Sequence, residues 1–337
     1  MDVLPPPLQM VQMLAGFQVS QALYAAAKLG VPDQLTAGPK HIDDIAAVLN
    51  VDRSALGRLA RTLSGIGVFS EVGEGRYELT PLGATLTSDQ PGSMRDLALM
   101  WMETHYAPFA GLVETVRTGH CAAEVYYGVP FFDWLVGQPE QIARFSGAMA
   151  NLTDGIKVAA IDTYDFSGAR QILDVGGADG TLLARVLQRV PEASGVAFDL
   201  PHVVPAVSVV AKEANVADRL TAEAGDFFER VPAGFDTYLL SMVLHDWDDE
   251  RAIRLLHNIA SAGGPGARVR ALELLVPAGN EPHLAKMIDL TMLAMLTGKE
   301  RTEPEYAAIF EAAGLRFERA VGTPTPLSMI EGSVPDR

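Results

Sequence analysis

The chain passes from a strand into a helix at residues 172–187, which read Ile-Leu-Asp-Val-Gly-Gly-Ala-Asp-Gly-Thr-Leu-Leu-Ala-Arg-Val-Leu. The apolar start suits a buried strand, and the apolar spacing after Gly180 suits an amphipathic helix. Glycines between the two permit a tight turn and let a ligand approach the backbone closely. The dinucleotide pattern G-x-G-x-x-G is not met, because Ala178 and Thr181 occupy two of its glycine positions. The stretch predicts an α/β domain in which this turn either meets a ligand or simply joins strand to helix.

Short apolar segments alternate with amphipathic ones from this point onward, which is typical of βαβ units and a parallel sheet. The predicted strands cover residues 171–175, 195–199, 219–223, 236–241 and 268–274. We therefore expect residues 161–337 to form an α/β domain with a doubly wound, mostly parallel sheet.

The N-terminal part of the chain has a different pattern. Apolar residues recur at helical spacing over residues 8–29, 42–49 and 53–66, and residues 68–79 predict a hairpin around Gly73-Glu74-Gly75. Helix, turn, helix and hairpin in this order indicate a mainly α-helical winged-helix domain over residues 1–92. Residues 93–160 look helical, with breaks at Pro108, Gly119 and residues 128–130, and would connect the two domains.

The composition excludes several classes of function. Lys and Arg total 26 against 42 Asp and Glu, a formal net charge of −16, which repels phosphate backbones and anionic lipid. The single cysteine, Cys121, excludes an intrachain disulfide and a cysteine-based zinc site. The N-terminus has no signal-peptide pattern, and no apolar stretch reaches the about 20 residues needed to span a bilayer. We expect a soluble, cytoplasmic protein that binds neither nucleic acid nor membranes.

Polar residues stand where the predicted strands end, and open α/β sheets bind ligands at that edge. Asp199 ends the second strand, about 20 residues after the glycine turn, where an acid can bind both hydroxyls of a ribose. Asp226 stands beside two phenylalanines after the third strand and suits the amino group of an adenine. His245 follows the fourth strand, and Glu273 lies near the end of the fifth. Each residue alone would be an ordinary cap or buried polar group, but their shared position predicts a ligand site.

Five motifs in this order resemble the class I S-adenosylmethionine-dependent O-methyltransferases of the plant caffeate and bacterial polyketide-tailoring type. They are residues 174–180, 199–201, 225–228, 244–250 and 298–302, and the resemblance covers nearly the whole chain. It implies a Rossmann-like catalytic domain that uses S-adenosylmethionine, releases S-adenosylhomocysteine and needs no metal. It also implies that the winged helix forms a homodimer and that segment 93–160 contributes to the substrate pocket.

The resemblance also assigns roles to single residues. His245 would be the general base, flanked and oriented by Glu273 and Glu300. The cofactor would be held by residues at the strand ends, namely Asp174, Gly176, Gly180, Asp199, Leu200, Asp226, Phe227, Ser241 and Trp247. The acceptor pocket would be lined by Phe145, Met149 and Met292. Two positions depart from the family: Ala178 replaces a glycine, at little cost if its φ is negative, and Ser241 replaces a lysine of the plant members.

Methyl transfer to a phenol calls for a base, because a neutral phenol is a poor nucleophile. Phenols have a pKa of about 10 and histidine one of about 6.5, so a neutral imidazole can take the proton as the oxygen attacks. A carboxylate behind the ring fixes its tautomer and stabilises the imidazolium that forms. The expected pocket residues are apolar and aromatic, which favours a small aromatic acceptor.

Three alternatives stay open at this stage. The same base could serve a nitrogen acceptor, and some relatives keep the fold and cofactor but catalyse hydroxylation or decarboxylation, typically after losing the histidine that is present here. A winged helix could also belong to a transcription regulator. Residues 41–100, however, hold five Arg against eight Asp and Glu, a net charge of −3, where a DNA-binding domain usually presents a basic face.

Overall fold

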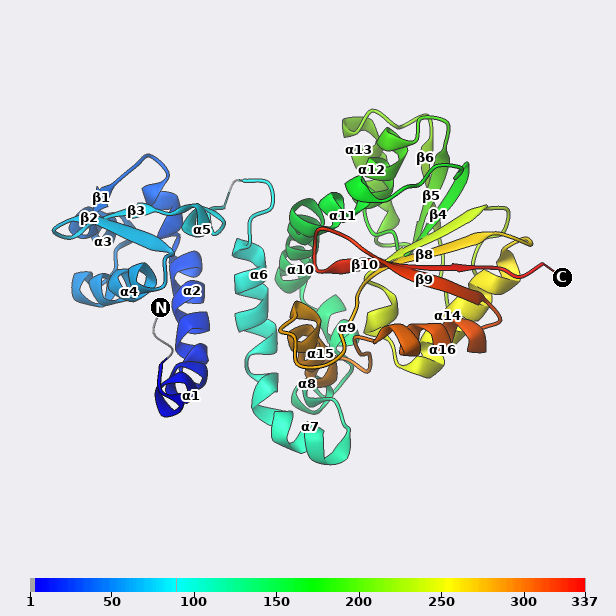
Figure 1. The fold of residues 1–337 in the computed structure, drawn as a ribbon. Coiled ribbons are helices and arrows are strands. Elements are labelled where there is room, and N and C mark those ends of the chain that lie inside the picture. The colour runs from blue at the N-terminus through cyan, green and yellow to red at the C-terminus, as the bar shows by residue number, and fades with distance from the viewer. Residues whose placement is uncertain (1–3, 89, 337) are drawn as a thin grey trace. The chain divides into compact units, whose positions relative to one another are not determined.

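The computed structural model describes residues 4–88 and 90–336, and Figure 1 shows their course. The chain forms two compact units. The first contains the described residues up to Ala107 together with Phe132–Leu152, and the second contains Pro108–Phe131 and the described residues from Thr153 onward. The predicted connecting segment 93–160 is therefore shared between the two units.

The second unit is built on a seven-stranded sheet with the order β6-β5-β4-β7-β8-β10-β9 (Figure 1). Its strands are β4 (Gln171–Val175), β5 (Ser194–Asp199), β6 (Leu220–Ala224), β7 (Thr237–Ser241), β8 (Arg268–Leu274), β9 (Arg316–Gly322) and β10 (Leu327–Ser333). Neighbours from β6 to β8 are parallel, whereas β10 is antiparallel to β8 and β9. The predicted mostly parallel sheet is confirmed, and each of the five predicted strands ends within one residue of the observed one. The sequence pattern misses β9 and β10.

Helices cover both faces of this sheet and bury its apolar side chains. Ile172 and Leu173, adjacent on β4, are fully buried in two different clusters, because successive strand residues point to opposite faces. One cluster includes residues of α11 (Val158–Thr163), α12 (Thr181–Arg189) and α13 (Val207–Glu213); the other includes residues of α14 (Asp249–Ala262) and α16 (Glu303–Ala312). Each fully buried leucine or isoleucine stabilises the fold by about 1.5–3 kcal/mol.

The remaining elements of the second unit lie before β4 or between strands of the large sheet. They are η3 (Pro108–Gly111), α7 (Leu112–Thr118), α8 (Ala122–Tyr127), η4 (Thr153–Lys157), η5 (Val204–Ala206), η6 (Leu244–Asp246) and α15 (Leu284–Met295), while α9 (Phe131–Val136) begins at the boundary of the units. The predicted breaks are confirmed: Pro108 starts a 3-10 turn, and Gly119 and Gly128 end helices in left-handed conformations.

The first unit contains the predicted winged helix. A small sheet with the order β1-β3-β2 packs with helices around a core that includes Ile45, Leu63 and Phe69. The elements of the first unit are α1 (Pro6–Leu14), α2 (Gly16–Leu29), η1 (Pro32–Leu35), β1 (Lys40–His41), α3 (Ile42–Leu49), α4 (Arg53–Gly65), β2 (Phe69–Gly73), β3 (Arg76–Leu79), α5 (Pro81–Ala84), α6 (Arg95–Met100), η2 (Trp101–His105) and α10 (Pro139–Leu152). The single helix predicted over residues 8–29 is instead two helices, which separate at Ala15, just before Gly16.

Large apolar side chains remain exposed on α1 and at the start of α2. Met13 is 74% exposed, Leu14 68% and Phe17 54%, and Met10 and Val11 are exposed as well. Large apolar side chains exposed together on neighbouring helices are typical of a contact with another molecule. In the described part of the chain, no helix is both long and apolar enough to cross a bilayer.

Candidate active site

Acidic and polar side chains end four adjacent strands of the large sheet. Asp174 lies near the end of β4, Asp199 ends β5, Ser241 ends β7, and Glu273 is the penultimate residue of β8. These strands are parallel neighbours, so their carboxyl ends form one edge of the sheet. The structure therefore brings together the strand-end residues that the sequence singled out.

The glycine turn after β4 is closely packed. Gly176 has a φ of 73°, and a side chain there would start 2.8 Å from Val243 Cγ2. Gly180 has a φ of 82° and caps α12. Ala178 has a φ of 48°, so the condition under which alanine would replace the glycine at little cost is not met. Its N–H donates to Asp199 Oδ2 at 2.9 Å, which helps to hold the alanine in this left-handed conformation.

The two acids expected to bind a nucleoside are fixed by the backbone around them. Asp199 Oδ1 accepts the N–H of Leu200 at 2.7 Å, and Oδ2 accepts that of Ala178. Burial raises the pKa of Asp199, although these two N–H groups oppose the shift. Asp226 Oδ1 accepts the N–H of Phe228 at 2.7 Å. Each carboxylate oxygen can accept a second hydrogen bond, so both acids can also bind a ligand.

Three aromatic rings pack edge to face beside Asp226. Phe228 lies 4.8 Å from Phe227 and 4.7 Å from Trp247, and Phe227 lies 6.2 Å from Trp247, measured between ring centroids. Asn258 Nδ2 donates to the carbonyls of Phe227 and Phe228 at 2.8 and 3.1 Å and so ties this loop to α14. The three rings therefore form an aromatic surface beside Asp226.

His245 lies in the turn that follows β7 and is buried. Its Nδ1 is 2.7 Å from Glu300 Oε1, while its Nε2 is 3.4 Å from Asp246 Oδ1. The structure thus places Glu300 against the histidine, and its role in orienting a base stays a prediction. When Nδ1 carries a proton, it donates a hydrogen bond to Glu300, and Nε2 is then the nitrogen that can accept a proton.

Glu273 contacts the backbone of this turn. Its Oε1 accepts the N–H groups of Val243 and Leu244 at 3.1 and 2.8 Å. The preceding residue, Met242, has a φ of 54°, which is unfavourable for a side chain of its size. Glu273 thus stabilises the turn that carries His245 and makes no hydrogen bond to the imidazole among the described residues.

The acids around His245 change its protonation. Burial lowers the pKa of His245, but the negative charges of Asp246, Glu300 and Glu273 outweigh burial and raise that pKa to about 10. Burial raises the pKa of Glu273 to about 7. A general base must be neutral, so the imidazole has to give up this proton before it can act as one.

His245, Glu273 and Glu300 also bring ligand-type atoms within 4.8 Å of one another, a spacing that suits a metal ion. Nδ1 of His245 and Oε1 of each acid already bond within the chain. Orientation of the imidazole and its turn accounts for these contacts without an ion.

Three residues near the site were not identified from the sequence. Asp246 faces Nε2 of His245, and Arg301, next to Glu300, is fully buried. Burial lowers the pKa of Lys157, although Asp174, Glu273 and Asp246 favour its charged form. Lys157 ends the π-helical turn η4, whereas the sequence pattern of residues 93–160 indicates only helix.

Several buried polar atoms at this edge have no hydrogen-bond partner within the described chain. Among them are Asp174 Oδ1, Ser241 Oγ and Trp247 Nε1. Buried polar groups are nearly always hydrogen-bonded, so these atoms point to a polar ligand. Together with Asp199 and Asp226 they fit S-adenosylmethionine, which carries amino-acid, ribose and adenine groups.

The expected acceptor-pocket residues lie in different parts of the fold. Met292 is buried on α15 in the second unit. Phe145 and Met149 lie on α10 in the first unit, where the Phe145 ring is 5.9 Å from that of Phe132. Their role as pocket residues stays a prediction.

Comparison with known proteins identifies close relatives. Two family models match, an O-methyltransferase domain over residues 109–316 and an O-methyltransferase dimerisation domain over residues 11–89. The phenazine O-methyltransferase PhzM of Lysobacter antibioticus is 41% identical over 96% of this chain and 94% of its own length. The crystal structure of LaPhzM has a TM-score of 0.92 at 40% identity and covers 98% of this chain and 100% of that chain.

A further solved structure contains ligands. NcsB1, an O-methyltransferase from neocarzinostatin biosynthesis in complex with S-adenosylmethionine and 2-hydroxy-5-methyl naphthoic acid, has a TM-score of 0.80 at 31% identity, over 94% of this chain and 96% of that chain. Other relatives catalyse different reactions. An 8-amino-8-demethylriboflavin N,N-dimethyltransferase of Streptomyces davaonensis is 35% identical over 91% of this chain and 89% of its own length. The aclacinomycin 10-hydroxylase RdmB of Streptomyces purpurascens is 33% identical over 94% of this chain and 87% of its own length.

The left-handed conformation of Ala178 predicts that Ala178→Gly stabilises the protein. Relief of strain is worth about 1–2 kcal/mol, and the greater freedom of glycine in the unfolded chain offsets about 0.4–1 kcal/mol of it. We expect a net gain of about 0.5–1 kcal/mol, measured as a higher thermal unfolding midpoint. Ala308→Gly, at an exposed position within α16, is the matched control and should destabilise by about 1 kcal/mol. If both variants lower the midpoint equally, Ala178 is not strained.

Proposed function

The chain belongs to the O-methyltransferase family, and we propose that it transfers the methyl group of S-adenosylmethionine to a hydroxyl group of a small aromatic acceptor, with His245 as the general base. The observation that carries the proposal is the buried contact between His245 Nδ1 and Glu300 Oε1, which leaves Nε2, 3.4 Å from Asp246 Oδ1, as the nitrogen that would accept a proton. S-adenosylmethionine, when bound, supplies a methyl group on a cationic sulfur that an oxygen nucleophile can displace.

The strand-end residues would hold this cofactor along its length. Asp199 would accept the ribose hydroxyls, while Asp226, Phe227 and Trp247 would hold the adenine. Gly176, Gly180, Leu200 and Ser241 would complete the cofactor site. Near the glycine turn, Asp174 and Lys157 offer one acidic and one basic group for an amino-acid end, since each contributes to the electrostatic field at the other.

His245 would accept the proton of the acceptor hydroxyl at Nε2. Glu300 keeps the other nitrogen protonated and stabilises the imidazolium that forms, and a base of this kind contributes about 10²–10⁴-fold to the rate. The acids that raise the pKa of His245 hold a proton on it in the ligand-free site. Any positive charge brought near the imidazolium lowers its pKa, so the histidine would lose that proton more easily in the loaded site.

The relatives support an aromatic acceptor. PhzM is a phenazine O-methyltransferase, and NcsB1 binds a hydroxy-naphthoic acid. Two relatives have names that indicate other reactions: one is an N,N-dimethyltransferase and the other is a hydroxylase. His245 together with Glu300 favours methyl transfer over hydroxylation, and the O-methyltransferases among the relatives favour a hydroxyl acceptor. We place the enzyme in secondary metabolism, as the relative from neocarzinostatin biosynthesis suggests, and we propose that it is cytoplasmic.

We also propose that the protein acts as a homodimer. The dimerisation-domain model covers residues 11–89, and the exposed apolar residues of α1 and α2 offer a surface that a second copy would bury. We propose that residues 1–92 form the dimerisation domain and that residues 161–337 form the catalytic domain. Residues 93–160 would connect the two and contribute to the substrate pocket.

The central proposal predicts transfer of label from methyl-labelled S-adenosylmethionine to at least one member of a panel of phenols, hydroxylated naphthoates and hydroxyphenazines. His245→Gln should lower turnover by about 10²-fold or more and keep the Kd for S-adenosylhomocysteine, measured by calorimetry, within about threefold.

Two results would count against this assignment. A loss of S-adenosylhomocysteine binding in a folded His245→Gln protein would mean that the histidine is structural. Label in an amine product, or a hydroxylated product without label, would replace O-methylation by one of the two other reactions found among the relatives.

The electrostatics of His245 predict how the rate depends on pH. The base must be neutral, so kcat/KM for the acceptor should rise with pH as the cluster around His245 loses its proton. Glu300→Gln removes one of the acids that raise the pKa of His245, so the rising limb should move to lower pH while the maximal rate falls. A limb at the same pH in both proteins would mean that it reports the acceptor's own ionisation.

The dimer proposal predicts a mass about twice 36.0 kDa by light scattering at micromolar concentration. The double change Leu14→Glu and Phe17→Glu should lower it to that of one chain, because each chain would bury two charges without partners. Val209→Glu, at an exposed apolar position on α13, is the control and should leave the mass unchanged. A monomeric mass for the unchanged protein would contradict the proposal.

A further inference from the structure

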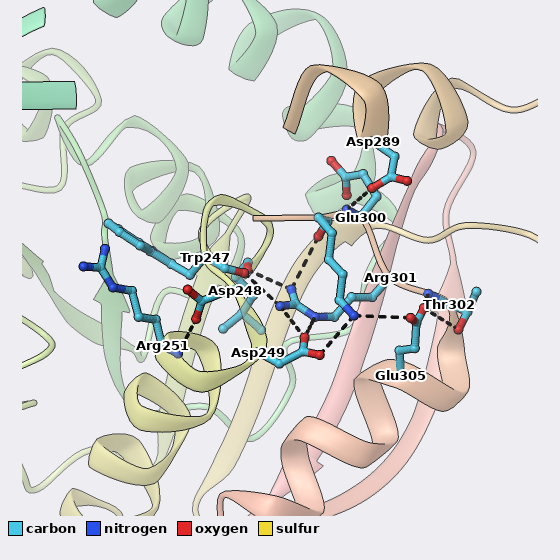
Figure 2. Close-up of polar contacts among 11 residues, drawn as sticks. Trp247, Asp248, Asp249, Arg251, Asp289, Glu300, Arg301, Thr302 and Glu305 are labelled. Carbon is cyan, nitrogen blue, oxygen red and sulfur yellow. Dashed lines mark hydrogen bonds and ion pairs between the residues drawn. The ribbon is translucent and has the colours of Figure 1, made fainter. Parts of the chain in front are cut away.

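Arg301 is a fully buried arginine that spans two loops of the site, as Figure 2 shows. Its Nη1 donates to the carbonyl of Leu244 at 2.9 Å, and its Nη2 donates to that of Trp247 at 2.8 Å. Its Nε and Nη2 both lie within 3.0 Å of Asp249 Oδ1. The guanidinium thus binds the loop that carries His245 immediately before and two residues after that histidine.

These contacts are specific to an arginine. A buried cation destabilises a fold unless its donors are paired, and here each of its three nitrogens has an acceptor. The planar, forked guanidinium can reach two carbonyls and a carboxylate at once, whereas the single ammonium of a lysine cannot do so in the same geometry.

Gly298 brings the two loops together at a second point. A side chain on Gly298 would begin 1.9 Å from the carbonyl oxygen of His245 and 2.4 Å from the carbonyl carbon of Asp246. The backbone of residues 298–302 therefore lies directly against that of the histidine turn. This contact is independent of any charge.

Glu300 lies between these two contacts. Its own N–H donates to Asp289 Oδ1 at 2.9 Å, as Figure 2 shows. Its side chain contacts His245 Nδ1. Because Glu300 and Arg301 are adjacent, a shift of the loop away from Leu244 and Trp247 would carry the Glu300 carboxylate away from the imidazole.

We infer that Arg301 is a positioning residue, which together with the close contact at Gly298 holds the Glu300 loop on the His245 turn and so keeps Glu300 bonded to Nδ1. The effect of Arg301 on catalysis rests on the proposed function, because Arg301 acts through the proposed base, His245. Asp246 belongs to the histidine's own turn and Glu273 to β8, so both acids would remain beside the imidazole without the Glu300 loop.

The test is the pKa of His245, measured by NMR in the protein with ¹⁵N-labelled histidine. The His245→Gln spectrum assigns the resonance among the seven histidines. In Arg301→Lys the pKa of His245 should fall by about one unit or more, because Glu300 no longer favours the charged ring. Gly298→Ala should lower it in the same direction without removing a charge. Turnover in Arg301→Lys should fall about tenfold or more, while the Kd for S-adenosylhomocysteine stays within about threefold.

Arg270→Lys is the matched control. Arg270 is also buried and donates to the carbonyls of Val269 and Gly332, but it lies within β8 rather than on the two loops. Arg270→Lys should leave the pKa of His245 unchanged. An unchanged pKa in a folded Arg301→Lys protein, or an equal shift in Arg270→Lys, would overturn the inference. The NMR result does not depend on methyl transfer, so failure of the proposed function would be recognised separately.

Discussion

The hydrogen bond of 2.7 Å between His245 Nδ1 and buried Glu300 Oε1 is the contact on which the site depends. It selects the nitrogen that faces the ligand site and provides a negative charge for the imidazolium. A carboxylate can do this only if its loop is held in place, because a shift of about 1 Å already weakens such a contact severely. The surrounding structure supplies that restraint: Glu273 holds the backbone before His245, and Arg301 holds the backbone on both sides of it.

The fold explains why these residues meet although they are far apart in sequence. Parallel strands bring Asp174, Asp199, Ser241 and Glu273 to one edge, and the turn after β7 adds His245. The same edge contains strained backbone at Ala178 and Met242, both with positive φ. Strain of this kind persists only where the surroundings hold it, and here Asp199 and Glu273 bond to the backbone at or next to those residues.

Much of this arrangement could be predicted from the sequence, because it depends on patterns that tertiary packing does not alter. Alternating apolar strands and helices located β4 to β8, and the shared strand-end position of Asp199 and His245 indicated the ligand edge. β9 could not be found in this way, since it is an exposed strand with charged residues among its apolar ones. The left-handed Ala178 was also missed, since alanine rarely adopts this conformation. The contacts of Arg301 and the position of Lys157 arise only when distant loops pack together.

The most direct test of the account is the structure of a ternary complex with S-adenosylhomocysteine and an acceptor that the enzyme methylates. We expect the reacting hydroxyl within about 2.6–3.2 Å of His245 Nε2, with Nδ1 still bonded to Glu300 and Asp246 displaced from Nε2. A hydroxyl bound away from the imidazole, with Nε2 still facing Asp246, would contradict the assignment of His245 as the base.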